Sequence, residues 1–351
     1  MWKIKVVVVD DSSIARSLLR NILENDADIE IIGEAVNGKE ALSLVKEHKP
    51  NLVTMDLEMP VMNGLEAIQE IMATCAVPIL VVSTDASEKN TFTALAHGAL
   101  DVISKPKPDT DEAMEFIAKV KLLSKVKVIT HLRSTMAQTN HSFVSMSQFP
   151  SLSTTKVGKA PVFAIASSTG GPQALAKILT ALPANFPCPI LVAQHISDGF
   201  GTGMAKWLGS LCKLPVQIAR SDDLIQGGTV YISPSEANFA VTSSHKVRLL
   251  TRLPHEIYRP NCDVLLESVA NVYGRLSVGI ILSGMGSDGV QGMLKIQQAG
   301  GHTLAQDEAS SVVFGMNKVA IDRGGVQKIL PVSDMALKIC QLAGLPHEHN
   351  G

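Results

Sequence analysis

The stretch VFAIASSTGGPQAL, from Val162 to Leu175, reads as an apolar strand, a turn of small residues and a helix. Pro172 fits the first turn of that helix, since its missing N–H would have no partner there. Ser167 and Ser168 therefore lie at the carboxyl end of a strand, where ligands bind in open parallel sheets. A hydroxyl in that place is a helix cap, part of an anion-binding loop or a nucleophile, and this stretch alone favours none of the three.

Length and composition predict a globular protein of two domains. The chain has 351 residues, of which 46% are hydrophobic and 18% charged, enough to build sizeable cores. The formal net charge of -2 argues against a protein dominated by contacts with nucleic-acid phosphates. The first residues, MWKIKVVVVDD, lack the apolar segment of a signal peptide, and no apolar run reaches membrane-spanning length. We therefore expect a cytoplasmic protein.

The cysteines predict free thiols. Their number is odd, their spacing is wide and no C-x-x-C pair occurs, as in a reduced cytosolic protein with neither a disulfide framework nor a zinc site. Two histidines near the C-terminus, His347 and His349, are interpreted as part of a solvated tail rather than as metal ligands. The cysteines are Cys75, Cys188, Cys212, Cys262 and Cys340.

The first 125 residues alternate between short apolar strands and helices, which predicts a parallel sheet with helices on both faces. The first strand, Val6–Val9, is a run of β-branched residues typical of a strand that is buried on both sides. Further strands are expected at Ile29–Glu34, Leu52–Met55, Pro78–Val82 and Ala99–Ile103, and helices at Ser13–Leu23, Lys39–Lys46 and Asp111–Leu123.

Polar residues follow these strands in a pattern: Asp10 with Asp11, then Asp56, Ser83 and Lys105. Because the carboxyl ends of parallel strands share one edge, the three carboxylates are expected to meet and repel one another unless a cation compensates. Mg²⁺ is a hard cation that carboxylate, carbonyl and water oxygens bind. The set suits phosphorylation of a carboxylate, with Asp56 as nucleophile, Lys105 as a second positive charge and Ser83 binding the added anion.

Four segments, VVVVDDS, VTMDLEMPVMNGLEAI, VVST and ISKP, together resemble the response-regulator receiver domain over about residues 3 to 125. The resemblance implies a flavodoxin-like fold with a five-stranded parallel sheet, in which Asp56 is the phospho-acceptor. The implied Mg²⁺ ligands are Asp10, Asp11, Asp56 and the backbone carbonyl of Glu58, and the implied phosphoryl contacts are Ser83 and Lys105.

Two details of the receiver resemblance concern the last strand. The bond between Lys105 and Pro106 is often cis in that family. Val102 stands where many receivers carry an aromatic switch residue. This departure argues against a readout by aromatic rotation, but not against phosphorylation.

The regular hydrophobic pattern of strands and helices ends after residue 125. Residues 126–159 are rich in Ser, Thr and Gln and are interpreted as a mobile interdomain linker. Alternation of strands and helices returns at residue 160 and continues to about residue 346, which predicts a second α/β domain. Strands of this domain are expected at Pro189–Gln194, Thr229–Ile232, Phe239–Thr242, Val247–Leu250, Ser277–Ser283 and Thr303–Gln306, some of them antiparallel. Helices are expected at Asp263–Tyr273 and from the end of the GMGSDG loop to about Gln298.

Ser168, His195 and Asp288 each follow a predicted strand, so the three side chains can converge on one edge of the sheet. A hydroxyl, an imidazole and a carboxylate in one place form an acyl-transfer triad, in which the imidazole takes the serine proton and the carboxylate orients the imidazole. Backbone N–H groups around Met285 and Gly286 would form the oxyanion hole. The chain order differs from that of α/β-hydrolases, and no G-x-S-x-G elbow is present.

The loop GMGSDG, from Gly284 to Gly289, also fits the G-x-G-x-x-G pattern of dinucleotide-binding proteins. The loop follows a strand and opens a helix, and Asp307 lies about twenty residues further on. By itself, the loop therefore fits a nicotinamide-binding site as well as a catalytic loop. Against this, Asp288 inside the loop would repel a pyrophosphate, and little chain remains for a full dinucleotide fold. A receiver-regulated, dinucleotide-binding oxidoreductase is the alternative function.

Five segments of the second half resemble the catalytic domain of the chemotaxis protein-glutamate methylesterase family: AIASSTGGPQAL, VAQHIS, YRPNCDVLLESVA, VGIILSGMGSDGVQGM and TLAQDEASSVVFGMNKVAI. The resemblance implies that Ser168 is the nucleophile, His195 the general base and Asp288 the orienting carboxylate. It also implies that the backbone amide of Met285 helps to bind the oxyanion.

The chain departs from this family just before the nucleophile. The family usually has Gly-Ala before the catalytic serine, where this chain has Ala166-Ser167. Ser168 is assigned because the following Thr-Gly-Gly fixes the register, and Ser167 remains the competing residue. Arg259 and Asp263 match a family segment, but a structural role at the start of a helix is as well supported as a contact with substrate.

The sequence therefore predicts a five-stranded flavodoxin-like receiver (1–125), a linker (126–159) and a doubly wound, mostly parallel α/β catalytic domain (160–346). The resemblance implies a phosphorylation-activated hydrolase that demethylates glutamate methyl esters on methyl-accepting chemotaxis receptors and deamidates receptor glutamines. It implies a chemotaxis histidine kinase as donor to Asp56, a receiver that covers the active-site edge before phosphorylation, and hydrolysis without a cofactor. Membrane contact is expected only through the receptors. A DNA-binding output is not expected, since no helix-turn-helix pattern or basic stripe occurs.

Overall fold

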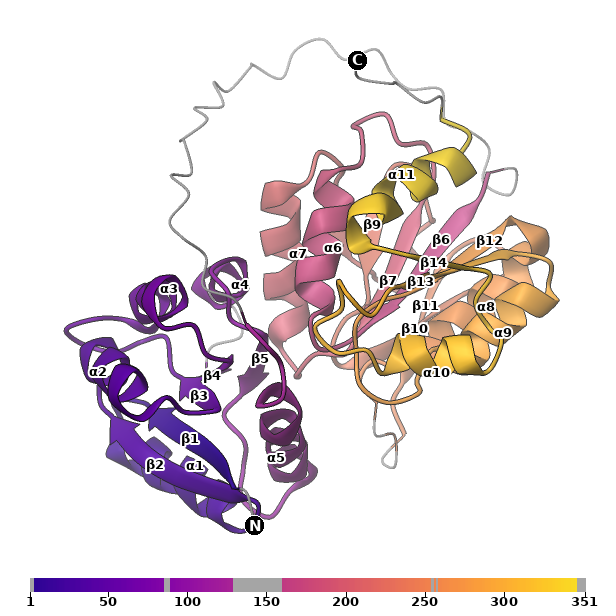
Figure 1. Cartoon of the computed structure of the whole chain (residues 1–351). Coiled ribbons are helices and arrows are strands. Elements are labelled where there is room, and N and C mark those ends of the chain that lie inside the picture. The colour runs from indigo at the N-terminus through magenta and orange to yellow at the C-terminus, as the bar shows by residue number, and fades with distance from the viewer. Residues whose placement is uncertain (1–2, 85–88, 129–159, 254–255, 257, 346–351) are drawn as a thin grey trace.

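The chain folds into two α/β units that pack against each other (Figure 1). The computed structural model describes residues 3–84, 89–128, 160–253, 256 and 258–345. The predicted linker from residue 129 onward, and the two C-terminal histidines His347 and His349, lie outside the described residues.

The N-terminal unit is a five-stranded parallel sheet between two layers of helices. Its elements are β1 (Ile4–Val9), α1 (Ser13–Glu24), β2 (Ile29–Ala35), α2 (Gly38–His48), β3 (Leu52–Met55), α3 (Gly64–Thr74), β4 (Ile79–Ser83), α4 (Lys89–Ala96), β5 (Asp101–Ser104) and α5 (Asp111–Leu123). The strand order is β2-β1-β3-β4-β5. The predicted flavodoxin-like arrangement of five parallel strands is thus confirmed.

Side chains of β1 alternate between the two helix layers, as the period of a strand requires. Val6 and Val8 pack in the core that α1 and α5 cover, whereas Val7 and Val9 pack in the core under α2, α3 and α4. All four side chains are fully buried. The β-branched run is therefore explained by burial on both faces.

The C-terminal unit has a seven-stranded parallel sheet and a separate antiparallel pair of strands. Its elements are β6 (Val162–Ser167), α6 (Gly171–Thr180), β7 (Ile190–Gln194), α7 (Phe200–Leu211), β8 (Val216–Ile218), β9 (Val230–Ile232), β10 (Ala237–Val241), β11 (Val247–Thr251), α8 (Cys262–Tyr273), a 3₁₀ turn (Gly274–Leu276), β12 (Ser277–Ile281), α9 (Val290–Gln298), β13 (His302–Gln306), α10 (Met316–Asp322), β14 (Lys328–Leu330) and α11 (Val332–Leu342). The sheet order β14-β13-β12-β6-β7-β9-β8 places β12, β6 and β7 side by side.

The turn between β6 and α6 depends on its glycines. Gly170 has a φ of 78°, in the left-handed region where a Cβ is unfavourable. A Cβ on Gly171 would overlap Gln194 Oε1. Pro172 lies in the first turn of α6, as predicted. The residues that follow β6 are therefore held close to the end of β7.

The two units share one continuous apolar core. The Phe92 ring on α4 packs between α7 residues, with ring centroids 5.9 Å from Trp207 and 6.5 Å from Phe200. Two polar contacts also join the units. Thr169 Oγ1 donates to Asp101 Oδ2 over 2.8 Å, and Gln173 Nε2 donates to the carbonyl of Ala99, between α4 and β5. The receiver thus contacts the residue that directly follows Ser168.

Several elements and one peptide bond differ from the sequence-based expectations. The sequence analysis gave no bounds for α3, α4, α7, α10 and α11, nor for β8 and β14. The start of α3 did carry a signal, since Asn63 and Glu66 form a capping box. The Lys105–Pro106 bond is not cis; within the described ranges the cis bond is Arg259–Pro260.

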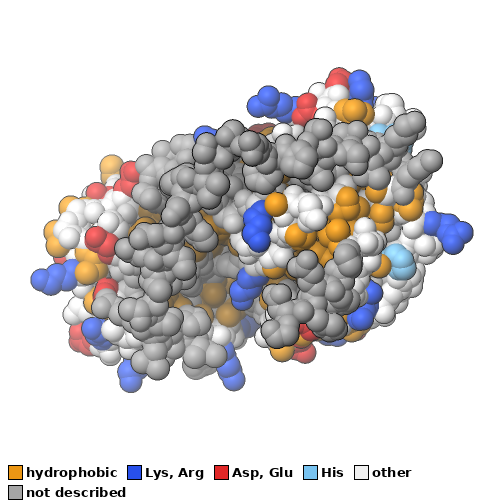
Figure 2. Space-filling model, turned by 90° about the horizontal axis from the view of Figure 1, so that it is seen from above, with side chains coloured by type: hydrophobic (Ala, Val, Ile, Leu, Met, Phe, Trp, Pro, Cys, Tyr) orange, Lys and Arg blue, Asp and Glu red, His pale blue; other side chains and the backbone are white. Residues whose placement is uncertain are grey.

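Among the described helices, none combines the length and apolar character needed to cross a membrane. Figure 2 shows the face that lies at the top of Figure 1. On the part of this face that is not grey, Lys and Arg side chains are scattered between apolar and neutral ones.

Candidate active site

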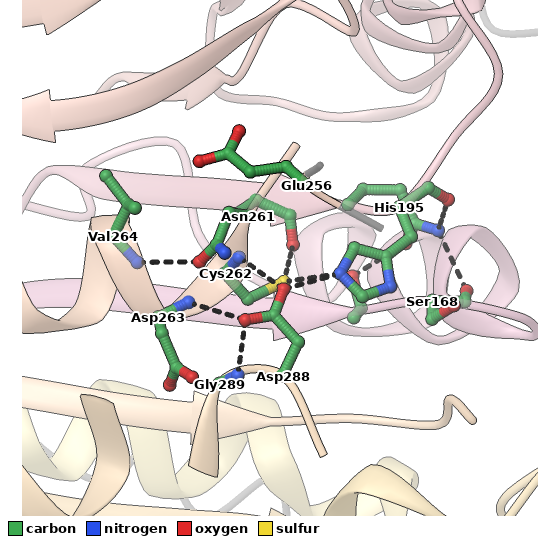
Figure 3. A network of polar contacts seen from close by, with 12 residues as sticks. Ser168, His195, Glu256, Asn261, Cys262, Asp263, Val264, Asp288 and Gly289 are labelled. Carbon is green, nitrogen blue, oxygen red and sulfur yellow. Dashed lines mark hydrogen bonds and ion pairs between the residues drawn. The ribbon is translucent and has the colours of Figure 1, made fainter. Parts of the chain in front are cut away.

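Ser168, His195 and Asp288 come together at the carboxyl edge of the larger sheet (Figure 3). Ser168 directly follows β6, His195 directly follows β7 and Asp288 lies in the loop after β12. Because these three strands are neighbours in the sheet, their ends bring the side chains into one cluster. The structure therefore places the three predicted residues together.

The imidazole of His195 lies between the carboxylate and the serine. Its Nε2 is 2.7 Å from Asp288 Oδ2, and Figure 3 shows Ser168 on the opposite side of the ring. Since a carboxylate only accepts hydrogen bonds, this contact assigns the proton to Nε2 and leaves Nδ1 as the basic nitrogen. The sequence predicts that His195 lies between Asp288 and Ser168, but it does not predict which ring nitrogen faces which of the two residues.

Asp288 is buried and held by the backbone. Its Oδ2 accepts from the Cys262 N–H over 2.6 Å, and its Oδ1 accepts from the N–H groups of Asp263 and Gly289 over 3.0 and 2.9 Å. Burial raises the pKa of the Asp288 carboxyl, but the hydrogen bond and charge of His195 and these N–H groups outweigh burial, so the pKa is lowered. The carboxylate is thus kept ionised and fixed in orientation.

Ser167 and Ser168 have different surroundings. Ser167 is fully buried, and its Oγ donates to Gln194 Oε1 over 2.6 Å. Gln194 Nε2 in turn donates to the carbonyl oxygens of Ser168 and His195, each over 2.8 Å. Ser167 therefore helps to tie the ends of β6 and β7 together, and these contacts favour Ser168 as the residue with a free chemical role.

The GMGSDG loop packs directly against Ser168. A Cβ on Gly284 would lie 2.7 Å from Ser168 Cβ, which shows how closely the two backbones approach. Within the described part of the chain, no group accepts a hydrogen bond from the Met285 amide. An unpaired N–H beside a nucleophile is the group that an oxyanion hole requires.

The dinucleotide reading of this loop does not fit the structure. The Asp288 carboxylate accepts from the Gly289 N–H, a group at the start of α9 that a pyrophosphate would need. Asp307 lies in its own turn, where Oδ1 accepts from the Ser310 N–H over 3.0 Å. Both carboxylates thus already accept hydrogen bonds from neighbouring groups, which argues against the dinucleotide interpretation.

Two residues that the sequence analysis did not single out contact His195. The Tyr258 ring stacks on the imidazole, with centroids 5.2 Å apart and an interplanar angle of 12°. The Sγ of Cys262 lies 3.4 Å from Nε2 of His195. Both residues belong to the YRPNCD segment, but nothing in their spacing indicates which residue of a distant strand they meet.

Asp263 and Arg259 have structural contacts. Asp263 Oδ1 accepts from the Gly292 N–H over 2.7 Å and so joins α8 to the start of α9. Burial raises the pKa of the Asp263 carboxyl to about 6, although the Gly292 N–H opposes this. The carbonyl of Arg259 accepts from the Ile196 N–H. These contacts favour the structural role that the sequence analysis left open.

The second predicted site lies at the carboxyl edge of the receiver sheet. Lys105 Nζ is 2.6 Å from Asp10 Oδ2 and 3.3 Å from Asp56 Oδ2. Burial raises the pKa of the Asp56 carboxyl to about 6, with Lys105 opposing and Asp10 adding to the shift. Ser83 ends β4 and is buried, and Glu58 is exposed just beyond β3. All five residues thus lie at the predicted edge.

Three carboxylates at this edge fit a hard cation. Asp10, Asp11 and Asp56 offer oxygen atoms that all lie within 4.8 Å of one another. An all-oxygen donor set with several negative charges is the type that Mg²⁺ prefers. A cation there would also relieve the repulsion that contributes to the raised pKa of Asp56.

Two families of known proteins match the two units of the chain. Residues 163–339 match the sequence profile of the CheB methylesterase, and residues 6–118 match that of the response regulator receiver domain. The chain belongs to the CheB methylesterase family. It is 50% identical, over 97% of both chains, to protein-glutamate methylesterase/protein-glutamine glutaminase 3 of Paramagnetospirillum magneticum. The protein-glutamate methylesterase/protein-glutamine glutaminase of Pyrococcus abyssi is 37% identical to this chain. The alignment covers 94% of this chain and 91% of the relative.

The CheB methylesterase catalytic domain of Thermotoga maritima has been solved as a crystal structure. The alignment covers 52% of this chain and 98% of the solved domain, with 34% sequence identity and a TM-score of 0.51. Family membership confirms the resemblance on which the sequence analysis relied, and with it the two-unit α/β fold.

Proposed function

We propose that this chain is a phosphorylation-activated protein-glutamate methylesterase that also deamidates glutamine. Its substrates would be methyl-accepting chemotaxis receptors, from which it releases methanol or ammonia, and the reaction would serve chemotactic adaptation. The observation that carries the proposal is the 2.7 Å contact between His195 and an ionised, buried Asp288, with Ser168 on the other side of the imidazole. Family membership supports the substrate class. Release of methanol or ammonia from receptor membranes tests it.

The geometry supports a double-displacement mechanism. His195 Nδ1 takes the proton of Ser168 Oγ as that oxygen bonds to the ester carbonyl carbon, and the Asp288 carboxylate stabilises the imidazolium. The Met285 N–H binds the oxyanion of the tetrahedral intermediate. Collapse transfers the proton to methoxide, which leaves as methanol, and water then hydrolyses the acyl-serine in the same two steps. A glutamine substrate follows the same path with ammonia as the leaving group.

Phosphorylation is proposed at Asp56. One Asp56 oxygen would bond to the phosphorus of a phosphohistidine on a chemotaxis histidine kinase, and the histidine nitrogen would leave. Asp10, Asp11, Asp56 and the Glu58 carbonyl would hold Mg²⁺, which supplies charge neutralisation at the transferring group. Lys105 Nζ and Ser83 Oγ would contact the phosphoryl oxygens.

The described arrangement of the two units supports an inhibited state. Ser168 is 7% exposed, and the His195 side chain is 12% exposed, so a protein substrate has little access to either. Asp101 of the receiver holds Thr169, the next residue after the nucleophile. Phosphorylation would shift the population toward an arrangement in which this contact is open.

Weakening the contact between the units is expected to raise basal activity. Phe92→Leu removes the ring contacts with Phe200 and Trp207, each worth about 0.5–1.5 kcal/mol in aromatic pairs. Because the two contacts together contribute about 1–3 kcal/mol and about 1.4 kcal/mol is a factor of ten, unphosphorylated Phe92→Leu should release methanol up to roughly 100-fold faster than the native chain. With a phosphodonor the two should reach the same rate, because the contact is then open in both. An unchanged basal rate would argue against inhibition through this contact.

Gly284→Ala is expected to lower kcat about 100-fold, since displacing a reacting group by about 1 Å has that effect. The new methyl group would lie 2.7 Å from Ser168 Cβ and would overlap Met316 Sδ. The methionine can move, but the serine backbone cannot. Gly209→Ala, whose Cβ makes only ordinary contacts, is the control and should keep native kcat. Methanol release and thermal unfolding of both variants separate loss of catalysis from loss of fold.

A further inference from the structure

Cys262 adds a thiol to the catalytic histidine and aspartate. It is the first residue of α8 and is fully buried. Its Sγ lies 3.4 Å from His195 Nε2, and its backbone N–H donates to Asp288 Oδ2 over 2.6 Å. Donor atoms of Cys262, His195 and Asp288 all lie within 4.8 Å of one another. Sulfur, nitrogen and oxygen donors thus converge on the side of the imidazole that faces away from Ser168 (Figure 3).

This donor set matches the ligands of a borderline-soft cation. Zn²⁺ binds thiolate at about 2.3 Å and imidazole at about 2.0–2.1 Å, so the two donor atoms of a tetrahedral site lie roughly 3.5 Å apart. The observed separation of 3.4 Å between Sγ and Nε2 agrees with that geometry. The 2.7 Å separation of Nε2 from Asp288 Oδ2 is shorter than the roughly 3.4 Å of a tetrahedral zinc site, so the carboxylate must withdraw by about 0.7 Å.

We propose that Cys262, His195 and Asp288 form an inhibitory binding site for Zn²⁺. Binding releases the Cys262 thiol proton to solvent, moves the single proton of His195 from Nε2 to Nδ1, and forms Zn–S, Zn–N and Zn–O bonds. The fourth position stays open for water.

Zinc at this position blocks the proposed general base. An imidazole that donates its Nε2 lone pair to Zn²⁺ carries its proton on Nδ1, so it cannot take a proton from Ser168, and Asp288 no longer stabilises an imidazolium. Inhibition therefore rests on the proposed triad, whereas metal binding does not. The sequence analysis expected no zinc site because these ligands come from three distant segments rather than from a short Cys and His motif.

The second metal site of the chain differs in chemistry, which makes the two separable. Within the described ranges, the other group of three metal-binding side chains is Asp10, Asp11 and Asp56, which offers oxygen only. That set favours Mg²⁺, whereas a thiolate and an imidazole favour Zn²⁺ or Co²⁺. Excess Mg²⁺ therefore keeps the receiver site filled while the softer ion is titrated.

Binding is tested with Co²⁺ alone as the probe, added to the full chain in excess Mg²⁺. The expected result is a near-ultraviolet thiolate-to-cobalt charge-transfer band in the native chain, retained in Cys212→Ser and lost in Cys262→Ser. Cys262→Val is the second variant, so that the test stands if serine disturbs the fold. A missing band in the native chain, or a band that survives in a folded Cys262 variant, would overturn the proposal.

Inhibition is tested by methanol release with added Zn²⁺, each variant being compared with its own metal-free rate. The Zn²⁺ concentration for half-inhibition should rise at least about tenfold in Cys262→Ser, because even loss of an outer partner of a metal site has that effect. A chelator should restore the native rate. Equal inhibition of both chains would contradict the proposal. If the chain releases no methanol at all, the proposed function fails, and the cobalt band still decides the metal site.

Discussion

Ser168→Ala is expected to lower methanol release from methylated receptors by on the order of 10⁴- to 10⁶-fold. The reason is that the replaced hydroxyl is the proposed nucleophile that bonds to the ester carbon, while His195 and Asp288 remain in place. The residual rate would come from substrate binding and from the Met285 N–H.

Ser167→Ala is the matched control for that experiment, since it removes the same hydroxyl from the neighbouring residue. Its Oγ donates to Gln194 over 2.6 Å and is fully buried, so the substitution costs one hydrogen bond. We expect a rate within about tenfold of the native one and a loss of about 1 kcal/mol in the free energy of unfolding. If Ser168→Ala stayed active while Ser167→Ala did not, the nucleophile would be wrongly assigned.

Stimulation by a small phosphodonor is expected to disappear in Asp56→Asn. In the native chain, phosphodonor and Mg²⁺ should raise methanol release roughly 5- to 150-fold, the range that coupling between two sites of a protein usually spans. The amide side chain of the variant offers no carboxylate to phosphorylate, so the variant should keep the basal rate under both conditions.

Asp26→Asn serves as the control for that loss. Asp26 is a carboxylate of the same unit that pairs with Lys121 over 3.0 Å and follows α1 rather than a strand end. It should respond to the phosphodonor as the native chain does. Equal stimulation of Asp56→Asn and the native chain would show that activation does not pass through Asp56.

The parts of both sites that follow strand ends could be predicted from the sequence. Ser168, His195 and Asp288 each come after an apolar run, and the carboxyl ends of parallel strands necessarily share an edge. The same reasoning gave Asp10, Asp56 and Lys105. The order of strands and helices and the chemical type of the residues after each strand gave the two clusters, whereas the choice of Ser168 over Ser167 also needed the family resemblance.

Contacts between distant segments could not be predicted in the same way. The packing of Phe92 between Phe200 and Trp207 depends on how two units dock, and no periodicity within either unit encodes that arrangement. The approach of Cys262 to His195 depends on where α8 crosses the sheet. The use of Nε2 by Asp288 depends on the rotamer of one imidazole. Such details are set by tertiary packing rather than by local pattern.

The most direct test of the account is methanol release from methylated receptor membranes by the native full chain, with and without Mg²⁺ and a small phosphodonor. We predict slow release by the unphosphorylated chain and faster release when the phosphodonor and Mg²⁺ are both present. Absence of methanol under every condition, from a chain shown to be folded and phosphorylated, would contradict the proposed methylesterase function.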